Sequence, residues 1–281
     1  MALHFGTIAS GSSGNCIFIG SDHTKVLIDA GLSGKKIEAG LTSLGVEPQS
    51  LDAILITHEH SDHIQGAGIL SRRFDVPIYA TPGTWEAVER FGSLGKIHPW
   101  NKLLVYSDER VLLNDLCINP FAIPHDAAEP VGYAVETEGF KAAIATDIGK
   151  VTPLIEGNVS DCDVLLIEAN HDLDMLENGP YPFPLKKRIR GDFGHLSNVA
   201  CGELLTRVYS ERLACVYLGH LSEENNHPAV AFETVNDILM ANGIDTTNKL
   251  KLAVADRHRP SRLVSLRAEA EDVAEDASAV G

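Results

Sequence analysis

The 281-residue sequence has little that points to export, to a membrane or to a disulfide-linked scaffold. Its five cysteines are scattered without a Cys-x-x-Cys pair, which is typical of buried free thiols in a reducing compartment. No apolar run is long enough to cross a bilayer. The first residues carry neither the basic region nor the apolar stretch of a secretion signal. We therefore expect a cytoplasmic protein that does not enter the membrane.

Positive charge is also scarce, with 23 Lys and Arg against 39 Asp and Glu and a formal net charge of −16. Proteins that bind polyanions usually show a basic footprint, so this composition argues against a nucleic-acid substrate. One basic run is a local exception, because it lies directly before a Gly-His loop at 194–195. Most such runs are solvated faces, but this position makes its members candidate phosphate contacts. They are Lys186, Lys187, Arg188 and Arg190.

The most informative segment reads His-Glu-His-Ser-Asp-His and begins at His58. It follows the run 52–57, which is short, apolar and typical of a core strand. If the chain stays extended past that strand, His58 and His60 point the same way, because residues two apart share a face. A turn would then aim Asp62 and His63 at a second point nearby. The spacing predicts a site for two metal ions, and a solvated His-rich loop is the structural alternative.

This spacing resembles the His-x-His-x-Asp-His motif of the metallo-β-lactamase fold. Three further residues of ligand type end apolar runs in that family's order, namely His125, Asp147 and His220. The resemblance implies that one ion is held by His58, His60 and His125. It implies that the other is held by Asp62, His63 and His220, with Asp147 between the two ions. Asp29, at the end of another apolar run, matches the family's first motif and is expected to orient a ligand.

The resemblance also implies an α/β fold, the four-layer αββα sandwich. Four segments make the resemblance more specific, to the YycJ/WalJ group; they are 11–15, 168–172, 194–198 and 220–226. This group is related to transfer-RNA 3′-processing endonucleases. In those endonucleases a Gly-His-Ser-Thr-like stretch places a histidine beside the scissile phosphate. His195 is therefore the candidate proton donor, although Leu196 and Ser197 replace the Ser-Thr pair here.

The ligand chemistry favours hydrolysis. Two metal ions bring the pKa of water from about 15.7 to near 7 and suit an anionic transition state. Nitrogen and oxygen ligands without cysteine fit zinc, with manganese as the alternative. We expect a phosphodiesterase or nuclease that uses a metal-bound hydroxide, preferably a DNA exonuclease, with Asp62 and His195 as catalytic residues. A small-molecule phosphodiester or thioester hydrolase and a non-enzymatic, metal-stabilised regulatory protein are the alternatives.

The sequence is expected to form one domain over residues 1–268, followed by an acidic disordered tail at 269–281. Apolar periodicity and turn signals predict helices over 84–91, 198–209 and 228–240, and a last strand near 250–255. Ser197 is the expected N-cap of the second helix.

Overall fold

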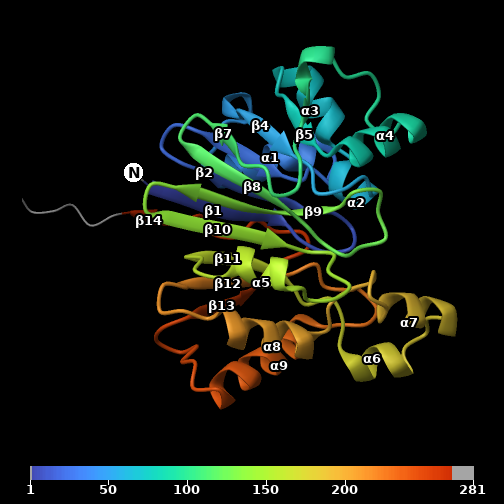
Figure 1. Cartoon of the computed structure of the whole chain (residues 1–281), viewed down its shortest axis with the longest axis vertical. Coiled ribbons are helices and arrows are strands. Elements are labelled where there is room, and N and C mark those ends of the chain that lie inside the picture. The colour runs from blue at the N-terminus through green and yellow to red at the C-terminus, as the bar shows by residue number, and fades with distance from the viewer. Residues whose placement is uncertain (1, 268–281) are drawn as a thin grey trace, which may run out of the picture.

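The computed structural model describes residues 2–267, which form two seven-stranded sheets packed face to face with helices outside each (Figure 1). This is the four-layer αββα sandwich that the sequence predicts, so that expectation is confirmed. The predicted acidic tail lies outside the described residues. Within residues 2–267, no helix has both the length and the apolar character to cross a membrane.

The first sheet combines the N-terminal half of the chain with its last strand. Its order is β14 (Val264–Arg267), β1 (Ala2–Ala9), β2 (Cys16–Gly20), β3 (Lys25–Ile28), β4 (Ala53–Leu55), β5 (Ile78–Ala80) and β6 (Lys102–Leu104). From β3 to β6 the strands are parallel, and parallel neighbours need crossover connections. The helical segments here are α1 (Gly34–Ser43), α2 (Ser61–Ile64), α3 (Ala67–Phe74), α4 (Pro82–Phe91) and the 3₁₀ turns Pro48–Ser50 and Pro99–Asn101.

The second sheet is built from the C-terminal half. Its order is β13 (Lys251–Val254), β12 (Cys215–Gly219), β11 (Val164–Glu168), β10 (Phe140–Ala145), β9 (Val131–Thr137), β8 (Leu116–Ala122) and β7 (Val111–Leu113). Strands β10 to β13 are parallel, which puts their carboxyl ends at one edge. Its helices are α5 (Pro153–Val159), α6 (Leu173–Asn178), α7 (Phe183–Ile189), α8 (Asn198–Val208) and α9 (Pro228–Ala241). Helices α6 and α7 project at the side of the sandwich (Figure 1).

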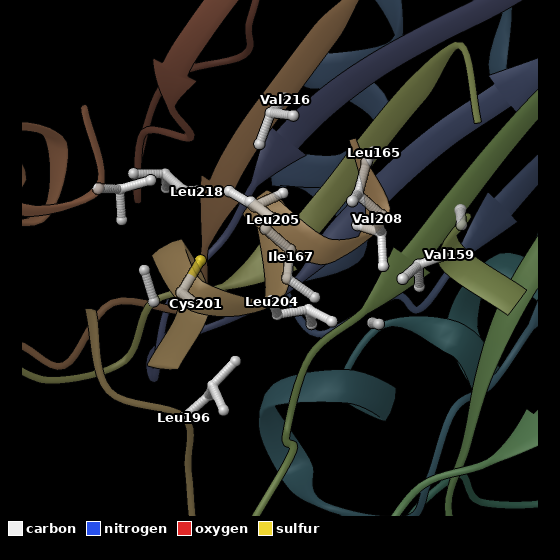
Figure 2. Close-up of a cluster of buried hydrophobic side chains, with 14 of the residues drawn as sticks. Val159, Leu165, Ile167, Leu196, Cys201, Leu204, Leu205, Val208, Val216 and Leu218 are labelled. Atoms are coloured by element: carbon white, nitrogen blue, oxygen red, sulfur yellow. The ribbon is translucent and has the colours of Figure 1, made fainter. Parts of the chain in front are cut away.

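Three apolar layers fill the spaces between these four layers of structure. Phe5 and Tyr133 lie in the layer between the sheets, and Leu204 and Leu205 of α8 pack against the second sheet (Figure 2). Strands that are covered on both faces usually have continuous apolar sequences, and the central strands of both sheets do. Each fully buried Leu or Ile contributes about 1.5–3 kcal/mol. The sandwich is therefore a rigid base on which the strand ends can carry polar residues.

The helix boundaries follow local signals in the sequence. The predicted helix at 84–91 begins earlier, at Pro82, because the side chain of Thr81 caps it by accepting from the Thr84 amide. Ser197 is the N-cap of α8, and its hydroxyl accepts from the Ala200 amide at 3.2 Å. The strand predicted near 250–255 is β13, but the prediction that it is the last strand is wrong, because β14 follows and pairs with β1.

Candidate metal centre

The predicted ligands lie at the edge of the sandwich where strands of both sheets end. In the first sheet Asp29 follows β3 and the motif at 58–63 follows β4. In the second sheet His125, Asp147 and His220 come after β8, β10 and β12. The crevice outside the carboxyl ends of parallel strands is the usual ligand site of α/β proteins. The fold thus brings together residues that are far apart in the sequence.

Three of these residues have left-handed backbone conformations. The φ angles are 59° at Asp29, 60° at Asp147 and 54° at His220. A non-glycine residue in this region costs of order 1–3 kcal/mol, and such residues cluster at functional sites. Here the conformation turns the chain directly after each strand.

One cluster contains His58, His60 and His125, whose candidate ligand atoms all lie within 4.8 Å of one another. Nε2 of His58 is 3.0 Å from Nδ1 of His60, and Nε2 of His125 is 3.4 Å from the same atom. The segment from 58 to 60 is not helical, and α2 begins at Ser61. His58 and His60 therefore converge as the alternation of an extended chain predicts.

The second cluster contains Asp62, His63 and His220. Oδ2 of Asp62 is 3.4 Å from Nε2 of His63 and 3.5 Å from Nε2 of His220. Asp62 and His63 reach this point because α2 turns the chain inward after His60. The cluster joins residues from both sheets across the crevice.

Asp147 lies between the two clusters. Its Oδ1 is 3.6 Å from Nε2 of His125 and 3.5 Å from Nε2 of His220, and its Oδ2 is 3.3 Å from Nε2 of His63. Oδ2 is buried and has no hydrogen-bond partner among the described residues. A buried carboxylate oxygen without a donor is costly, and a cation at this point would satisfy it. The donor set therefore fits bound divalent metal.

Asp29 and Thr57 support His63 from behind. Oδ2 of Asp29 is 2.7 Å from Nδ1 of His63, while Oδ1 accepts from the Thr57 amide at 2.8 Å. When Nδ1 donates to Asp29, the neutral ring presents the lone pair of Nε2 to the cluster. Burial raises the pKa of Asp29, against the opposing influence of His63. These contacts are those expected of a residue that orients a ligand.

Glu168, at the end of β11, is fully buried and supports two histidines at once. Its Oε1 is 2.8 Å from Nδ1 of His195 and 2.9 Å from Nδ1 of His220. Its Oε2 accepts from the amides of Ile148 and Leu196 at 2.7 and 3.0 Å. All four neighbours donate to one carboxylate, which leaves Nε2 of each histidine facing the crevice.

Close backbone contacts hold the motif in place. An added Cβ at Gly31 would lie 1.6 Å from the carbonyl oxygen of Asp62, so only glycine fits there. The Asn15 amide donates to the same carbonyl oxygen at 2.8 Å. The side chain of Asn15 bonds the backbone of Gly11 and lies 3.2 Å from Nε2 of His63. The Gly-Ser-Ser-Gly-Asn segment at 11–15 thus packs directly against the motif.

Burial lowers the pKa of His58 and of His125 in the first cluster, whereas carboxylates outweigh burial in the second. Burial on its own would lower the pKa of His220, but Asp147 and the hydrogen bonds to Asp62 and Glu168 raise it to about 10. The pKa of His63 likewise lies above its usual range, because nearby carboxylates overcome burial. The centre attracts positive charge, and protons and divalent cations compete for it.

Two hollows that share Ser12 flank the centre, and the two together are here called the groove. On one side is a hollow of about 190 Å³ lined by His195 and His220, and on the other is one of about 280 Å³ lined by Asp62 and Gln65. Ser12 belongs to both hollows. The centre is therefore approached from two sides rather than through a single closed pocket.

The predicted phosphate contacts lie on or next to α7 but differ in what they touch. Arg188 lines the hollow on the His195 side. Lys186 donates to the Glu177 carbonyl oxygen at 2.6 Å, and Arg190 forms an ion pair with the Glu177 side chain. Lys187 is exposed, and its side chain makes no hydrogen bond or ion pair within residues 2–267. Two of the four cations thus tie α7 to α6.

Residues 24–217 match a family model described as a β-lactamase superfamily domain. The chain belongs to this superfamily. It is 36% identical to exodeoxyribonuclease YycJ of Bacillus anthracis over an alignment of 263 residues. This alignment covers 94% of this chain and 99% of the relative. It is 42% identical to exodeoxyribonuclease WalJ of Streptococcus pneumoniae over an alignment of 249 residues, which covers 87% of this chain and 93% of that relative. The expected resemblance to the YycJ/WalJ group is confirmed.

Solved structures agree on the superfamily fold. YhfI of Bacillus subtilis, a metallo-β-lactamase fold protein, has a TM-score of 0.70 at 14% identity and covers 92% of this chain and 98% of its own. The short form of human tRNase Z has a TM-score of 0.63 at 16% identity and covers 95% and 100%. Superfamily membership and the ligand clusters together indicate that this chain binds divalent metal.

Within this superfamily fold, sequence reasoning missed the part played by Glu168. The signal was present, because Glu168 ends an apolar run in the same way as Asp29 and Asp147. The spacing of a sequence does not show which strand end faces which histidine. The supporting contacts of Asn15 and Thr57 were missed for the same reason.

Proposed function

We propose that this chain is a binuclear metal-dependent phosphodiesterase that acts on nucleic acid, mainly as a DNA exonuclease. The observation that carries the proposal is the alignment over almost the whole chain with YycJ and WalJ, both named exodeoxyribonucleases. The paired ligand clusters supply the chemistry, and the two hollows that flank the centre leave room for a polymer.

Two ions are proposed for the two clusters. The ligands of the first are His58, His60 and His125, those of the second are Asp62, His63 and His220, and Asp147 is shared. Imidazole nitrogens and carboxylate oxygens suit zinc, with manganese as the alternative. When bound, such ions activate water at neutral pH and offset charge on a phosphate. Asp29 and Glu168 keep Nε2 of His63 and of His220 directed at the ions.

His195 is proposed to give a proton to the leaving oxygen. It lines the groove, and its ring centroid is 5.3 Å from that of His125 and 5.4 Å from that of His220. Nδ1 is held by Glu168, so Nε2 is the atom available to substrate. The carboxylate of Asp62, which is partly exposed in the groove, is proposed to orient the attacking water as well as to bind metal.

The decisive experiment uses purified, metal-loaded protein and end-labelled single- and double-stranded DNA and RNA. Release of mononucleotides from one end of DNA is expected, with RNA cut more slowly. Absence of cleavage of any polymer, together with turnover of small phosphodiesters, would refute the nuclease proposal.

The role of His195 is tested by His195→Ala. The variant should keep its metal content and lose about a hundredfold or more in rate on DNA, the usual weight of a general acid. A diester with an activated leaving group needs little protonation and should be hydrolysed at close to the wild-type rate. His23→Ala, an exposed histidine away from the groove, is the control. Loss of metal from the His195 variant would make the residue a support for a ligand instead.

Phosphate contact by the basic run is tested at the two cations that do not bind Glu177. Replacing Lys187 and Arg188 together by Glu should weaken DNA cleavage strongly. Because few phosphates are neutralised, a plot of the logarithm of DNA affinity against the logarithm of salt concentration should have only a shallow slope. Unchanged DNA cleavage would remove this run from the proposed interface.

The second candidate function is hydrolysis of a small phosphodiester or thioester. The net charge of −16 favours it, because the field of the whole protein repels a polyanion. The same substrate panel separates the two candidates, since a small-molecule hydrolase would turn over the diester and leave every polymer intact.

A further inference from the structure

A hollow outside the groove carries positive charge that none of the functions described above uses. Its volume is about 340 Å³, and its lining includes Lys36 of α1 and His258 of the loop between β13 and β14. Lys35 and Arg259 are the neighbours of these two residues in the sequence. All four side chains are exposed. Lys35, Lys36, His258 and Arg259 are here called the basic patch.

The cations of the basic patch have no acidic partner. The side chains of Lys35, Lys36 and Arg259 make no ion pair or hydrogen bond within residues 2–267. The acids of the same two segments are already engaged, because Glu38 of α1 forms an ion pair with a residue of α3 at 2.7 Å and Asp256 accepts from amides of its own loop. In a chain with a formal net charge of −16, this patch is a local exception that suits an anionic ligand.

The loop that carries His258 and Arg259 is held in place at both ends. Oδ1 of Asp256 accepts from the amides of these two residues at 2.7 and 2.9 Å. The carbonyl oxygen of Asp256 accepts from the Ser10 amide at 3.1 Å, and the Ser261 amide donates to a carbonyl oxygen of β1 at 2.8 Å. Because this backbone is already ordered, little conformational entropy is lost when the loop binds a ligand.

The basic patch adjoins the centre on the Asp62 side. Gly31 lines the hollow that contains Asp62, and the next residue, Leu32, lines the hollow of the basic patch. Arg257 also lines the hollow of the patch, and its guanidinium donates to the Ser12 hydroxyl of the groove at 3.4 Å. The two hollows are therefore neighbours, whereas α7 borders the other hollow of the groove.

We propose that the basic patch binds the phosphate backbone of a polymer substrate beyond the Asp62 side of the centre. The proposal rests on the proposed nuclease function and adds a second backbone contact to the one proposed at α7. Phosphate is common to every sequence, so such a contact positions the polymer without selecting bases. Because the patch lies outside the ligand clusters, only a substrate long enough to extend past the centre can reach it.

DNA of increasing length tests the proposal, in whichever form the wild type cleaves. Fluorescence anisotropy with metal-loaded protein and phosphorothioate-linked DNA gives Kd at each length. Lys36→Glu combined with Arg259→Glu should leave Kd unchanged for DNA that is too short to reach the patch. At about 0.1 M salt one phosphate contact is worth roughly 8-fold in affinity, so the loss of two should raise Kd for longer DNA by about 60-fold.

The salt dependence separates a phosphate contact from a structural role. For longer DNA, a plot of the logarithm of affinity against the logarithm of salt concentration should be steeper for wild type than for the variant by about 1.8, since each contact contributes about 0.9. For short DNA both proteins should show the shallow slope expected of the α7 contact alone. Lys36→Gln combined with Arg259→Gln removes positive charge without adding negative charge, and should reduce the slope by the same amount.

Lys251→Glu combined with Arg267→Glu is the matched control. It changes the net charge equally, but these exposed residues lie at the start of β13 and the end of β14, at the edge of the sandwich opposite the centre. Its Kd should equal the wild-type value at every length. Hydrolysis of a small phosphodiester should be unchanged in every variant, because no residue of the basic patch lines the groove.

The outcomes distinguish this inference from the proposed function. Cleavage of DNA with equal Kd for wild type and the patch variants at every length would overturn the proposal, leave the nuclease standing and favour an acidic protein segment as the ligand of the patch. A loss as large on the shortest DNA as on the longest, or an equal loss in the control, would also overturn it. Failure of wild type to bind or cut any polymer would overturn both.

Discussion

Glu168→Gln isolates the most heavily used carboxylate of the centre. Glu168 is fully buried, and each of its oxygens serves two donors. Oε1 faces Nδ1 of His195 and of His220, and Oε2 faces the amides of Ile148 and Leu196. Glutamine has almost the same shape, so the substitution changes charge and hydrogen bonding without leaving a cavity.

The size of the effect follows from where the new NH₂ group points. Facing the amides, it would leave two buried N–H groups without an acceptor, at about 1–3 kcal/mol each and thus roughly 2–6 kcal/mol of stability. Facing the histidines, it would force each Nδ1 to accept, which moves the ring proton of His220 to Nε2, its candidate ligand atom. Loss of such a supporting partner typically costs about 10–100-fold in metal affinity or activity.

The assay combines metal titration, a thermal melt and hydrolysis of an activated diester. If the NH₂ group of the glutamine faces the histidines, we expect metal affinity to fall by about 10–100-fold. If it faces the two backbone amides, we expect the melting temperature to fall. Glu156→Gln is the control, because Glu156 forms only an exposed ion pair with Arg207. Wild-type metal affinity, stability and activity in the Glu168 variant would refute the assignment of Glu168 as the support of His220.

Further predictions concern the ligands, the glycines and the thiols. Asp62→Ala should lower the metal bound per chain, measured by elemental analysis, while the far-ultraviolet spectrum stays native. Gly31→Ala should destabilise the protein by about 1–3 kcal/mol or more in urea unfolding, because its Cβ would meet a backbone oxygen. Gly157→Ala, in helix α5 with open space around it, should stabilise by about 0.5–1 kcal/mol. Of the five thiols, Cys117 alone should react readily with a thiol reagent in native protein, since the others are buried and burial raises the pKa of Cys162 to about 12. Fast reaction of more than one thiol would contradict the packing.

Much of the fold was predictable because its signals are local. Apolar runs of strand length, the cap at Ser197 and Pro228 at the start of α9 depend on nearby residues. The motif at 58–63 was informative for the same reason, since the alternation of an extended chain alone brings His58 and His60 together. The order of His125, Asp147 and His220 added the remaining members through family resemblance.

The sequence by itself thus determined which residue types stand at the strand ends, and from their spacing the chemistry they can perform. Only the tertiary structure decided how they are supported. Glu168 meets His195 and His220 because β11 pairs with β12 and the loop before α8 folds back over β11, and no spacing rule states such pairings. The tertiary structure also determines that Lys186 and Arg190 bind Glu177, while Arg188 faces the groove. Contacts between distant segments depend on how the layers pack, which local sequence patterns do not encode.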